Sequence, residues 1–237
     1  NMARIAGVDL PLEKRTDSGV LVPRTLTFLN EHGVFYTSLY NTLGFDVSLS
    51  PTSNDKISDL GKKYSHSECC YPVILAHGHA AFLKQRMNPD DKILLPNVIS
   101  DGGLKFCPYV ASSGFLISGN LKLFDKSLLP VLRFNNADYP IEEAVREDLS
   151  RAFKKRFSRK KVRDAVERAS YEQQKFVSRV HEKGRDILEK LKEKGENVFV
   201  SIGRGYTVFD DKANSNIAEL FSSNGLHYIP SYFIGFE

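Results

Sequence analysis

Short apolar segments alternate with helical patterns along most of this chain, and this alternation is the feature that most restricts its fold. Each apolar segment has the length of a β-strand and is bounded by glycine, proline or polar residues. The predicted strands are residues 19–22, 45–50, 92–99, 128–134, 197–202 and 227–233. Strands separated by helices are typical of βαβ units, so the sequence predicts an α/β fold with a mostly parallel sheet and flanking helices.

Apolar residues at three- and four-residue intervals predict the helices between these strands. Shorter helices are expected at residues 26–43, 54–60, 72–86 and 216–221, and another opens at Pro140. Gly44 and Gly61 are placed to end the first two. Residues 1–18 are polar and aperiodic, which predicts a mobile leader or an edge segment.

A much longer helix is predicted from about Ser158 to Lys194, because its apolar residues form a single stripe. At about 1.5 Å per residue it would be roughly 50 Å long, enough to bridge two domains. We therefore expect a cysteine-bearing α/β domain, a helical bridge with this long helix and the start of a second α/β unit, incomplete as the chain stands, at residues 19–136, 137–195 and 196–237.

The composition indicates a globular protein of the cytoplasm. Charged residues make up 26% of the 237 residues, and the formal net charge of +4 is too small to argue for a nucleic-acid partner. No apolar run approaches the roughly 18 residues of a membrane span, and no signal-peptide core is evident. Three cysteines, two of them adjacent, predict a reducing compartment rather than a disulfide framework.

Cys70 lies immediately before a segment that Pro72 can open as a helix. The free N–H groups and the positive dipole end of a helix favour a thiolate over a thiol. Cys70 is thus placed for chemistry or for metal binding. The alternative is a buried thiol in a strand-to-helix turn, which is a common position for cysteine.

The other candidate ligands are Cys107, Cys69 and His77. Cys107 precedes Pro108 in a glycine-bearing loop and is the natural second ligand beside Cys70. Cys69 cannot readily bind the same iron as its neighbour, so it is expected close to the site but not as a ligand. His77 shares a helix face with Cys70 and could form a hydrogen bond near the thiolate, although a structural role is the alternative.

Two further features could bind anions. Arg204 lies between two glycines after a predicted strand and could clamp a phosphate, although a tight turn is the alternative. Eight basic side chains without an acid between them occupy residues 151–163 and could dock an acidic partner or coenzyme A. The acidic residues just upstream could instead neutralise this run, which would leave a solvated helix face.

Several motifs, taken in order, resemble one known family. They are Val22-Pro23-Arg24, the segment 43–51, Ser67-Glu68-Cys69-Cys70-Tyr71-Pro72, His77-Gly78-His79, the segment 95–100, Cys107-Pro108 and Gly203-Arg204-Gly205-Tyr206. This set resembles the domain of unknown function in CoA-substrate-specific enzyme activases, the activase-related proteins of 2-hydroxyacyl-CoA dehydratases. The resemblance runs from about residue 19 to the end. It departs from the family at Gly205 and Thr207, where proline and histidine are usual.

The resemblance implies a fold similar to that of the dehydratase subunits, whose cysteines hold a [4Fe–4S] cluster. It places Cys70 and Cys107 at the matching positions. The family usually continues into a segment with another cysteine. A cluster is therefore expected in a longer native protein and is not expected on this chain alone, although both cysteines should face a common cleft. The implied partners are the activase ATPase domain or the dehydratase subunits.

The sequence thus favours an accessory or redox module of the 2-hydroxyacyl-CoA dehydratase and activase type, with electron transfer through an iron–sulfur site. A metal-free α/β module that binds an acyl-CoA or a partner protein through residues 151–163 is the alternative. Neither interpretation includes a nucleic acid or a membrane as a partner.

Overall fold

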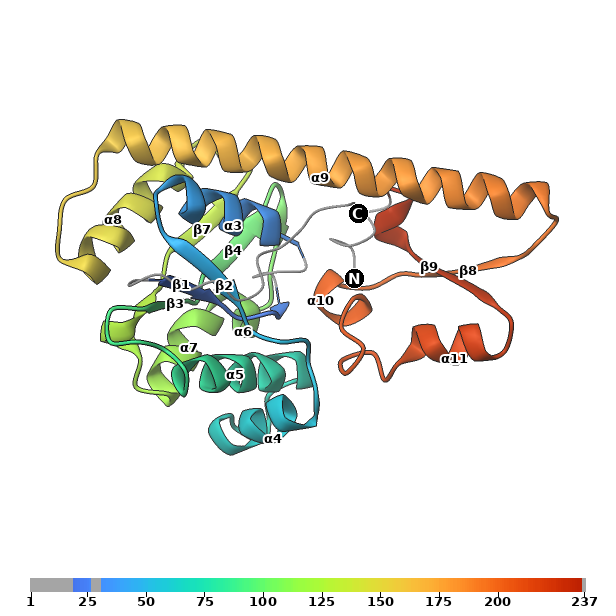
Figure 1. The fold of residues 1–237 in the computed structure, drawn as a ribbon, viewed down its shortest axis with the longest axis horizontal. Helices are drawn as coiled ribbons and strands as arrows, with labels where there is room; N and C mark the ends of the chain where they lie inside the picture. The colour runs from blue at the N-terminus through green and yellow to red at the C-terminus, as the bar shows by residue number, and fades with distance from the viewer. Residues whose placement is uncertain (1–18, 27–30, 236–237) are drawn as a thin grey trace.

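The computed structural model describes residues 19–26 and 31–235. The leader predicted at residues 1–18 and the part of the first helix at residues 27–30 lie outside this range. Within the described part, the alternation of strands and helices is confirmed. Helix α9 runs along the long axis of the molecule, above an N-terminal α/β unit and a smaller C-terminal one (Figure 1).

The main sheet has four parallel strands in the order β2-β1-β3-β6. Their bounds are Gly19–Val22 for β1, Asp46–Leu49 for β2, Lys92–Leu94 for β3 and Ser127–Leu128 for β6. Strand β1 lies between β2 and β3 and is buried along its whole length. This agrees with the short apolar sequence of β1, since parallel strands are covered on both faces.

Two predicted strands are each divided by a proline. Residues 92–99 form β3 and then β4, Asn97–Asp101, and residues 128–134 form β6 and then β7, Val131–Phe134. Pro96 and Pro130 lie at the breaks, where proline has no N–H for the ladder. The backbone N–H groups of Leu95 and Asn97 still donate to Leu128 and Pro130, so the pairing continues across the breaks. Strands β4 and β7 are parallel, and β5, Leu104–Lys105, pairs antiparallel with β4.

The helices of the N-terminal unit enclose these strands. They are α3, Gly33–Thr42; α4, Asp55–Tyr64; α5, Tyr71–Lys84; α6, Pro108–Ala111; α7, Ser113–Asn120; and α8, Ile141–Phe153, with a 3-10 turn η1 at Phe124–Lys126. None of the helices in the described ranges has the length and apolar content to cross a membrane.

The predicted end of α4 at Gly61 is wrong. The helix continues to Tyr64, and Gly61 instead lies against the backbone of α5. A Cβ atom on Gly61 would lie 2.1 Å from the carbonyl oxygen of Ile74, and one on Gly78 would lie 1.9 Å from that of Ile57. Both glycines are therefore needed for the close approach of α4 and α5.

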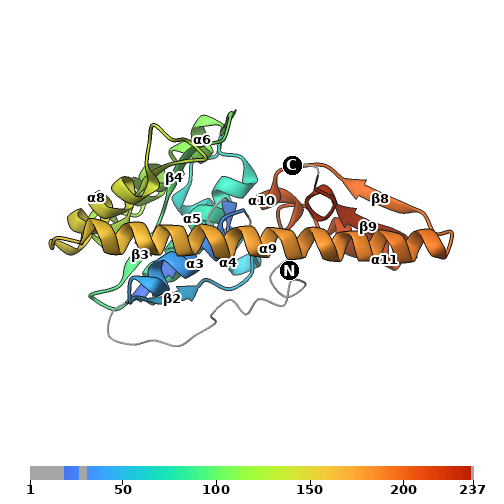
Figure 2. The ribbon, with the colours of Figure 1, turned by 90° about the horizontal axis from the view of Figure 1, so that it is seen from above.

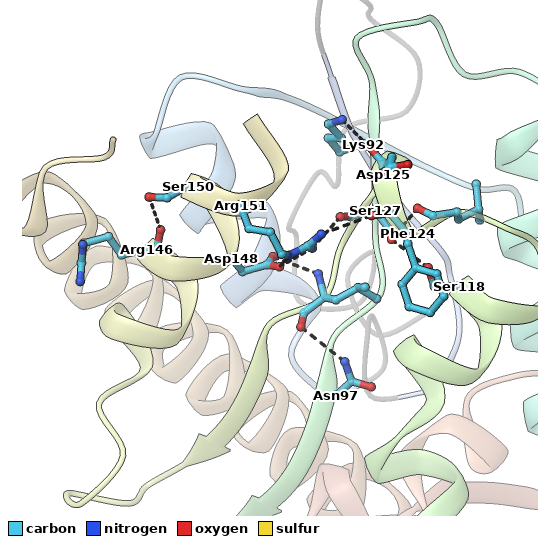
Figure 3. Close-up of polar contacts among 12 residues, drawn as sticks. Lys92, Asn97, Ser118, Phe124, Asp125, Ser127, Arg146, Asp148, Ser150 and Arg151 are labelled. Carbon is cyan, nitrogen blue, oxygen red and sulfur yellow. Dashed lines mark hydrogen bonds and ion pairs between the residues drawn. The ribbon is translucent and has the colours of Figure 1, made fainter. Parts of the chain in front are cut away.

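Helix α8 is joined to the sheet by a buried acid. The Asp148 carboxylate accepts a hydrogen bond from the backbone N–H of Leu129 at 2.9 Å. It also forms an ion pair with Arg151 (Figure 3). Arg151 also donates to the carbonyl oxygens of Phe124 and Ser127. The first basic side chain of residues 151–163 is therefore a structural contact of α8 with η1 and the start of β6.

Helix α9, Arg159–Glu193, agrees closely with its prediction. Ser158 caps its N-terminus by accepting from Lys161 N, and Gly195 follows its end with a positive φ of 68°. The first half of α9 packs in the main core, which also contains the sheet and α8. The second half extends beyond this core toward the C-terminal unit (Figure 2).

The C-terminal unit contains a parallel pair of strands, β8, Val198–Ser201, and β9, His227–Pro230. Between them come α10, Gly205–Val208, and α11, Ile217–Ser223, and β9 leads into a 3-10 turn η2, Ser231–Phe233. A small second cluster joins this unit to α3 and α9 through Val34, Phe176, Val180, Ile229 and Phe233. A Cβ on Gly184 of α9 would lie 1.8 Å from the Phe233 carbonyl oxygen, so α9 and η2 are also in close contact.

Candidate functional site

Cys70 and Cys107 occupy equivalent positions at the starts of two helices. Cys70 is the N-cap of α5, with Pro72 in its first turn, and Cys107 is the N-cap of α6, which begins at Pro108. Their backbones have nearly the same conformation, with φ and ψ of −64° and 151° for Cys70 and −63° and 155° for Cys107. Both thiols are exposed, so both are accessible to a ligand.

The two cysteines share a neighbour, Tyr206 of α10. Burial raises the pKa of the Tyr206 hydroxyl, and the nearby charges of Cys107, Glu31 and Cys70 raise it further, whereas Arg204 lowers it. Two helix starts that are 37 residues apart in the chain thus act on the same side chain of the C-terminal unit. Tyr206 belongs to one of the sequence motifs, but no role could be predicted for it. Its proximity to the cysteines arises only from the packing of the two units.

Cys69 and His77 differ from Cys70 in what surrounds them. Cys69 is 7% exposed and belongs to the main core. The Nδ1 atom of His77 donates to the Val73 carbonyl oxygen at 2.8 Å, which leaves Nε2 to accept from the Asn120 amide at 3.1 Å. Both ring nitrogens of His77 therefore bind α5 and the end of α7 rather than a thiol.

Arg204 precedes α10, and its side chain lines a cavity. Its guanidinium carbon lies 5.6 Å from the centre of the ring of Phe106, the residue that precedes Cys107 in the sequence. The backbone N–H of Gly205, which a phosphate cradle would use, already donates to the Tyr232 hydroxyl at 3.2 Å. Any anion bound here would therefore contact the Arg204 side chain rather than the glycine turn.

The cavity contains a group of titratable residues that sequence reasoning missed. Burial raises the pKa of Glu31 to about 7, although Arg204 and the Tyr232 hydroxyl oppose the rise. Burial lowers the pKa of His32 to about 4, and its Nε2 lies 3.6 Å from an Asp101 carboxylate oxygen. The ring of His32 also stacks on Phe134 at 3.9 Å. No local motif marks these residues, which come from the loop before α3 and from the end of β4.

A second polar group joins the two units through Ser50, His79, Ser53 and Asp210, here called the Ser–His–Ser–Asp chain. Ser53 donates to the Asp210 carboxylate at 2.5 Å, so its oxygen accepts from His79 Nε2 at 2.9 Å. Nδ1 of His79 then accepts from the Ser50 hydroxyl at 2.8 Å. Burial lowers the pKa of His79 to about 3 and raises that of Asp210. The ring of His79 is therefore neutral and has a defined tautomer.

The basic run at residues 151–163 is partly neutralised. Arg151 pairs with Asp148, Arg159 with Glu143 and Arg163 with Glu167. The other five basic side chains are exposed and form no ion pair with the described residues: Lys154, Lys155, Arg156, Lys160 and Lys161. Acids just upstream therefore neutralise Arg151 and Arg159, as one interpretation predicted, and docking through the five other side chains stays a prediction.

The cysteines fit an iron–sulfur cluster only in part. Iron–sulfur clusters are held by cysteine thiolates, ordinarily four. Cys70 and Cys107 offer two accessible thiols, but no three histidine, cysteine or acidic side chains in the described part of the chain lie close enough to hold a metal ion. A complete cluster would need ligands in addition to these residues.

Residues 20–234 match a protein family described as CoA enzyme activase uncharacterised domain. The chain belongs to this family. The match covers nearly the whole chain and includes both units and α9, in agreement with the resemblance of the ordered motifs. Neither a curated protein nor a solved structure gives a match.

Proposed function

We propose that this family member is an accessory module of 2-hydroxyacyl-CoA dehydratase systems and that it contributes Cys70 and Cys107 to an iron–sulfur site used for electron transfer. The observation that supports the proposal most is the equivalent placement of these two exposed thiols, each on the N-cap residue of a helix with proline in its first turn. Buried structural cysteines have no need for such a position, as Cys69 illustrates.

The residues of this chain would hold the thiolates and their surroundings. Each sulfur belongs to the N-cap residue of a helix, α5 or α6, where the backbone N–H groups of the first turn have no partner within the helix. The guanidinium of Arg204 adds a positive charge close enough to lower the pKa of Tyr206, which the charges of Cys107 and Cys70 raise. A [4Fe–4S] cluster, when bound, would supply one-electron transfer at this place.

The remaining ligands would come from a longer form of the protein or from a partner. The activase ATPase domain and the dehydratase subunits are the proposed partners, because the family is defined by activases of CoA-dependent enzymes. Two exposed thiols suit a site that is completed from outside, since a partner can reach each of them. In this proposal the chain itself carries no ATPase activity.

Anaerobic reconstitution with iron and sulfide tests the proposal. We expect little iron on the chain alone and a stable visible absorbance when a candidate partner is added. Cys70→Ser and Cys107→Ser should each abolish the absorbance, whereas Cys69→Ala is the matched control and should keep it once folding is verified. A colourless mixture with every candidate partner, or equal loss in the Cys69 variant, would contradict the proposal.

The second candidate is a metal-free module that binds an acyl-CoA or a partner protein through the exposed lysines and arginine of residues 151–163. The five unpaired basic side chains favour it, because phosphate groups bind clustered cations. Titration with coenzyme A at low and high salt tests this function. Salt-dependent binding by a colourless protein with three free thiols would support it.

A further inference from the structure

The cavity beside Arg204 is large enough for a small organic molecule. Its volume is about 760 Å³, within the range of ligand sites. It is lined by the carboxyl ends of β4 and β7, by α9 and by the C-terminal unit. Ligands of open α/β sheets bind at the carboxyl ends of strands, and Figure 1 shows that α9 and α10 flank this position.

Apolar side chains form part of the cavity wall, and polar or charged side chains form the rest. The apolar residues include Phe35 of α3, Phe106 after β5, Phe134 at the end of β7, and Phe176, Val177 and Val180 of α9. Such walls favour a ligand with an apolar body, since its burial removes apolar surface from water. Neither Cys70 nor Cys107 is among the described residues that line the cavity, so it is distinct from the cysteine site.

The acidic side chains in the cavity already have donors. Asp101 accepts from the Asn135 amide at 2.7 Å and lies close to His32 Nε2. Glu31 accepts a hydrogen bond from the Tyr232 hydroxyl at 3.4 Å. A cationic ligand would therefore have to replace contacts that these carboxylates already make.

The guanidinium of Arg204, unlike these carboxylates, has no hydrogen-bond partner among the described residues. Its guanidinium is close enough to Glu31 to lower the pKa of that carboxyl, but the two form neither a hydrogen bond nor an ion pair. Among the described residues Arg204 has an aromatic contact with Phe106 and no acceptor for its five N–H donors. A planar guanidinium of this kind binds carboxylates through two parallel hydrogen bonds.

We propose that this cavity binds a small carboxylic acid with an apolar body, whose carboxylate is held by Arg204 and whose body lies among the phenylalanine and valine side chains. The ligand would sit between the two units, beside α9. The inference goes beyond the proposed function, because it shares only Arg204 with the cysteine site and is tested without iron or sulfide.

Calorimetric titration with octanoate and with octanamide tests the proposal. The two probes have the same apolar chain, but the amide has no charge for Arg204. We expect octanoate to bind and Arg204→Gln to weaken it by about tenfold or more, as expected for loss of a charge-assisted pair. The affinity for octanamide should change little in the Arg204→Gln variant. Arg185→Gln, on an exposed part of α9, is the matched control and should leave both affinities unchanged.

Two further measurements keep the test decisive. Ser170 lines the cavity from α9, so Ser170→Phe should block octanoate without removing a charge, even if Arg204→Gln folds poorly. Octanoyl-CoA, a thioester without the free carboxylate, should not compete with octanoate. Absence of octanoate binding, equal affinities for the acid and the amide, or equal effects of the two arginine variants would overturn the proposal. Competition by octanoyl-CoA would also overturn it, because it would indicate an acyl-thioester site.

Discussion

The two halves of α9 are covered by very different amounts of protein. Val162, Ala165, Val166 and Ala169 in the first half are buried in the main core. In the second half Phe176 and Val180 join only the small cluster of α3, β9 and η2. One continuous helix thus passes from a large core to a small one, and its backbone hydrogen bonds alone cannot make the two regions equally stable.

For its length, the C-terminal unit exposes more large apolar side chains than the N-terminal unit does. Phe199, Val200 and Ile202, on and just after β8, are 47%, 42% and 88% exposed. Parallel strands are normally covered on both faces. We therefore expect the C-terminal unit to open at a lower free energy than the N-terminal sheet, with the polar contacts between the units limiting that opening.

The largest effect should come from a cavity in the main core. Ile93 of β3 is fully buried between β1 and β6, so Ile93→Ala should lower the free energy of unfolding by about 2–5 kcal/mol. Ile202→Ala makes the same chemical change at an exposed position and should alter it by about 0.5 kcal/mol or less. Urea unfolding measures both changes. Similar losses of unfolding free energy in the two variants would contradict the expected difference between the two regions.

A smaller and more local effect is expected from the contact between the units. Ser53→Ala leaves His79 Nε2 without its acceptor and removes the Ser53 donor from Asp210 Oδ2, which should cost about 1–3 kcal/mol. Hydrogen exchange should become faster in β8, β9 and α10 but not in β1 and β3.

Ser223→Ala is the control for this prediction, because that hydroxyl is exposed and donates only within α11. Uniformly faster exchange in both units after the Ser53 change would show that the Ser–His–Ser–Asp chain stabilises the whole fold rather than its junction.

The junction should also show a dependence on pH. The pKa of Glu31 is about 7 in the folded protein and 4.5 in the unfolded reference, so the folded state binds more protons between these values. The contribution of Glu31 to stability is therefore lost as the pH rises through this window. His32, with a lowered pKa of about 4, acts in the opposite direction.

Comparison with Glu31→Gln separates the two residues. As the pH rises from about 5 to about 8, the unfolding midpoint of the wild type should fall relative to that of this variant. Parallel pH profiles for the two proteins would show that Glu31 does not titrate in this range.

The smallest effect should come from the basic surface. Changing Lys154, Lys155, Lys160 and Lys161 to glutamate should cost about 0.5 kcal/mol or less for each substitution, because these side chains are exposed. The ammonium of Lys155 lies 5.2 Å from the centre of the Phe157 ring, so its change should be the largest of the four. If the variant binds every identified partner as the wild type does, at low and high salt, this surface has no role in docking.

The elements that the sequence predicted well are those with strong local signals. Ser158 and Gly195 defined the ends of α9 to within one residue, because a side-chain cap and a left-handed glycine act within one helical turn. The proline after Cys70 likewise located the start of α5. In contrast, Gly61 was mistaken for a helix end, since its close contact is with α5 and not with its own neighbours.

The sequence by itself determined the alternation of strands and helices, the family of the chain and the two cysteines that precede prolines. These depend on residues that are adjacent or one helical turn apart. Only the tertiary structure brought Cys70 and Cys107 to Tyr206, joined Ser53 to Asp210 and placed Arg204 in the cavity with Glu31 and Asp101. These groups are separated by up to 173 positions, from Glu31 to Arg204, and they meet because α9 folds the C-terminal unit back toward the ends of the strands.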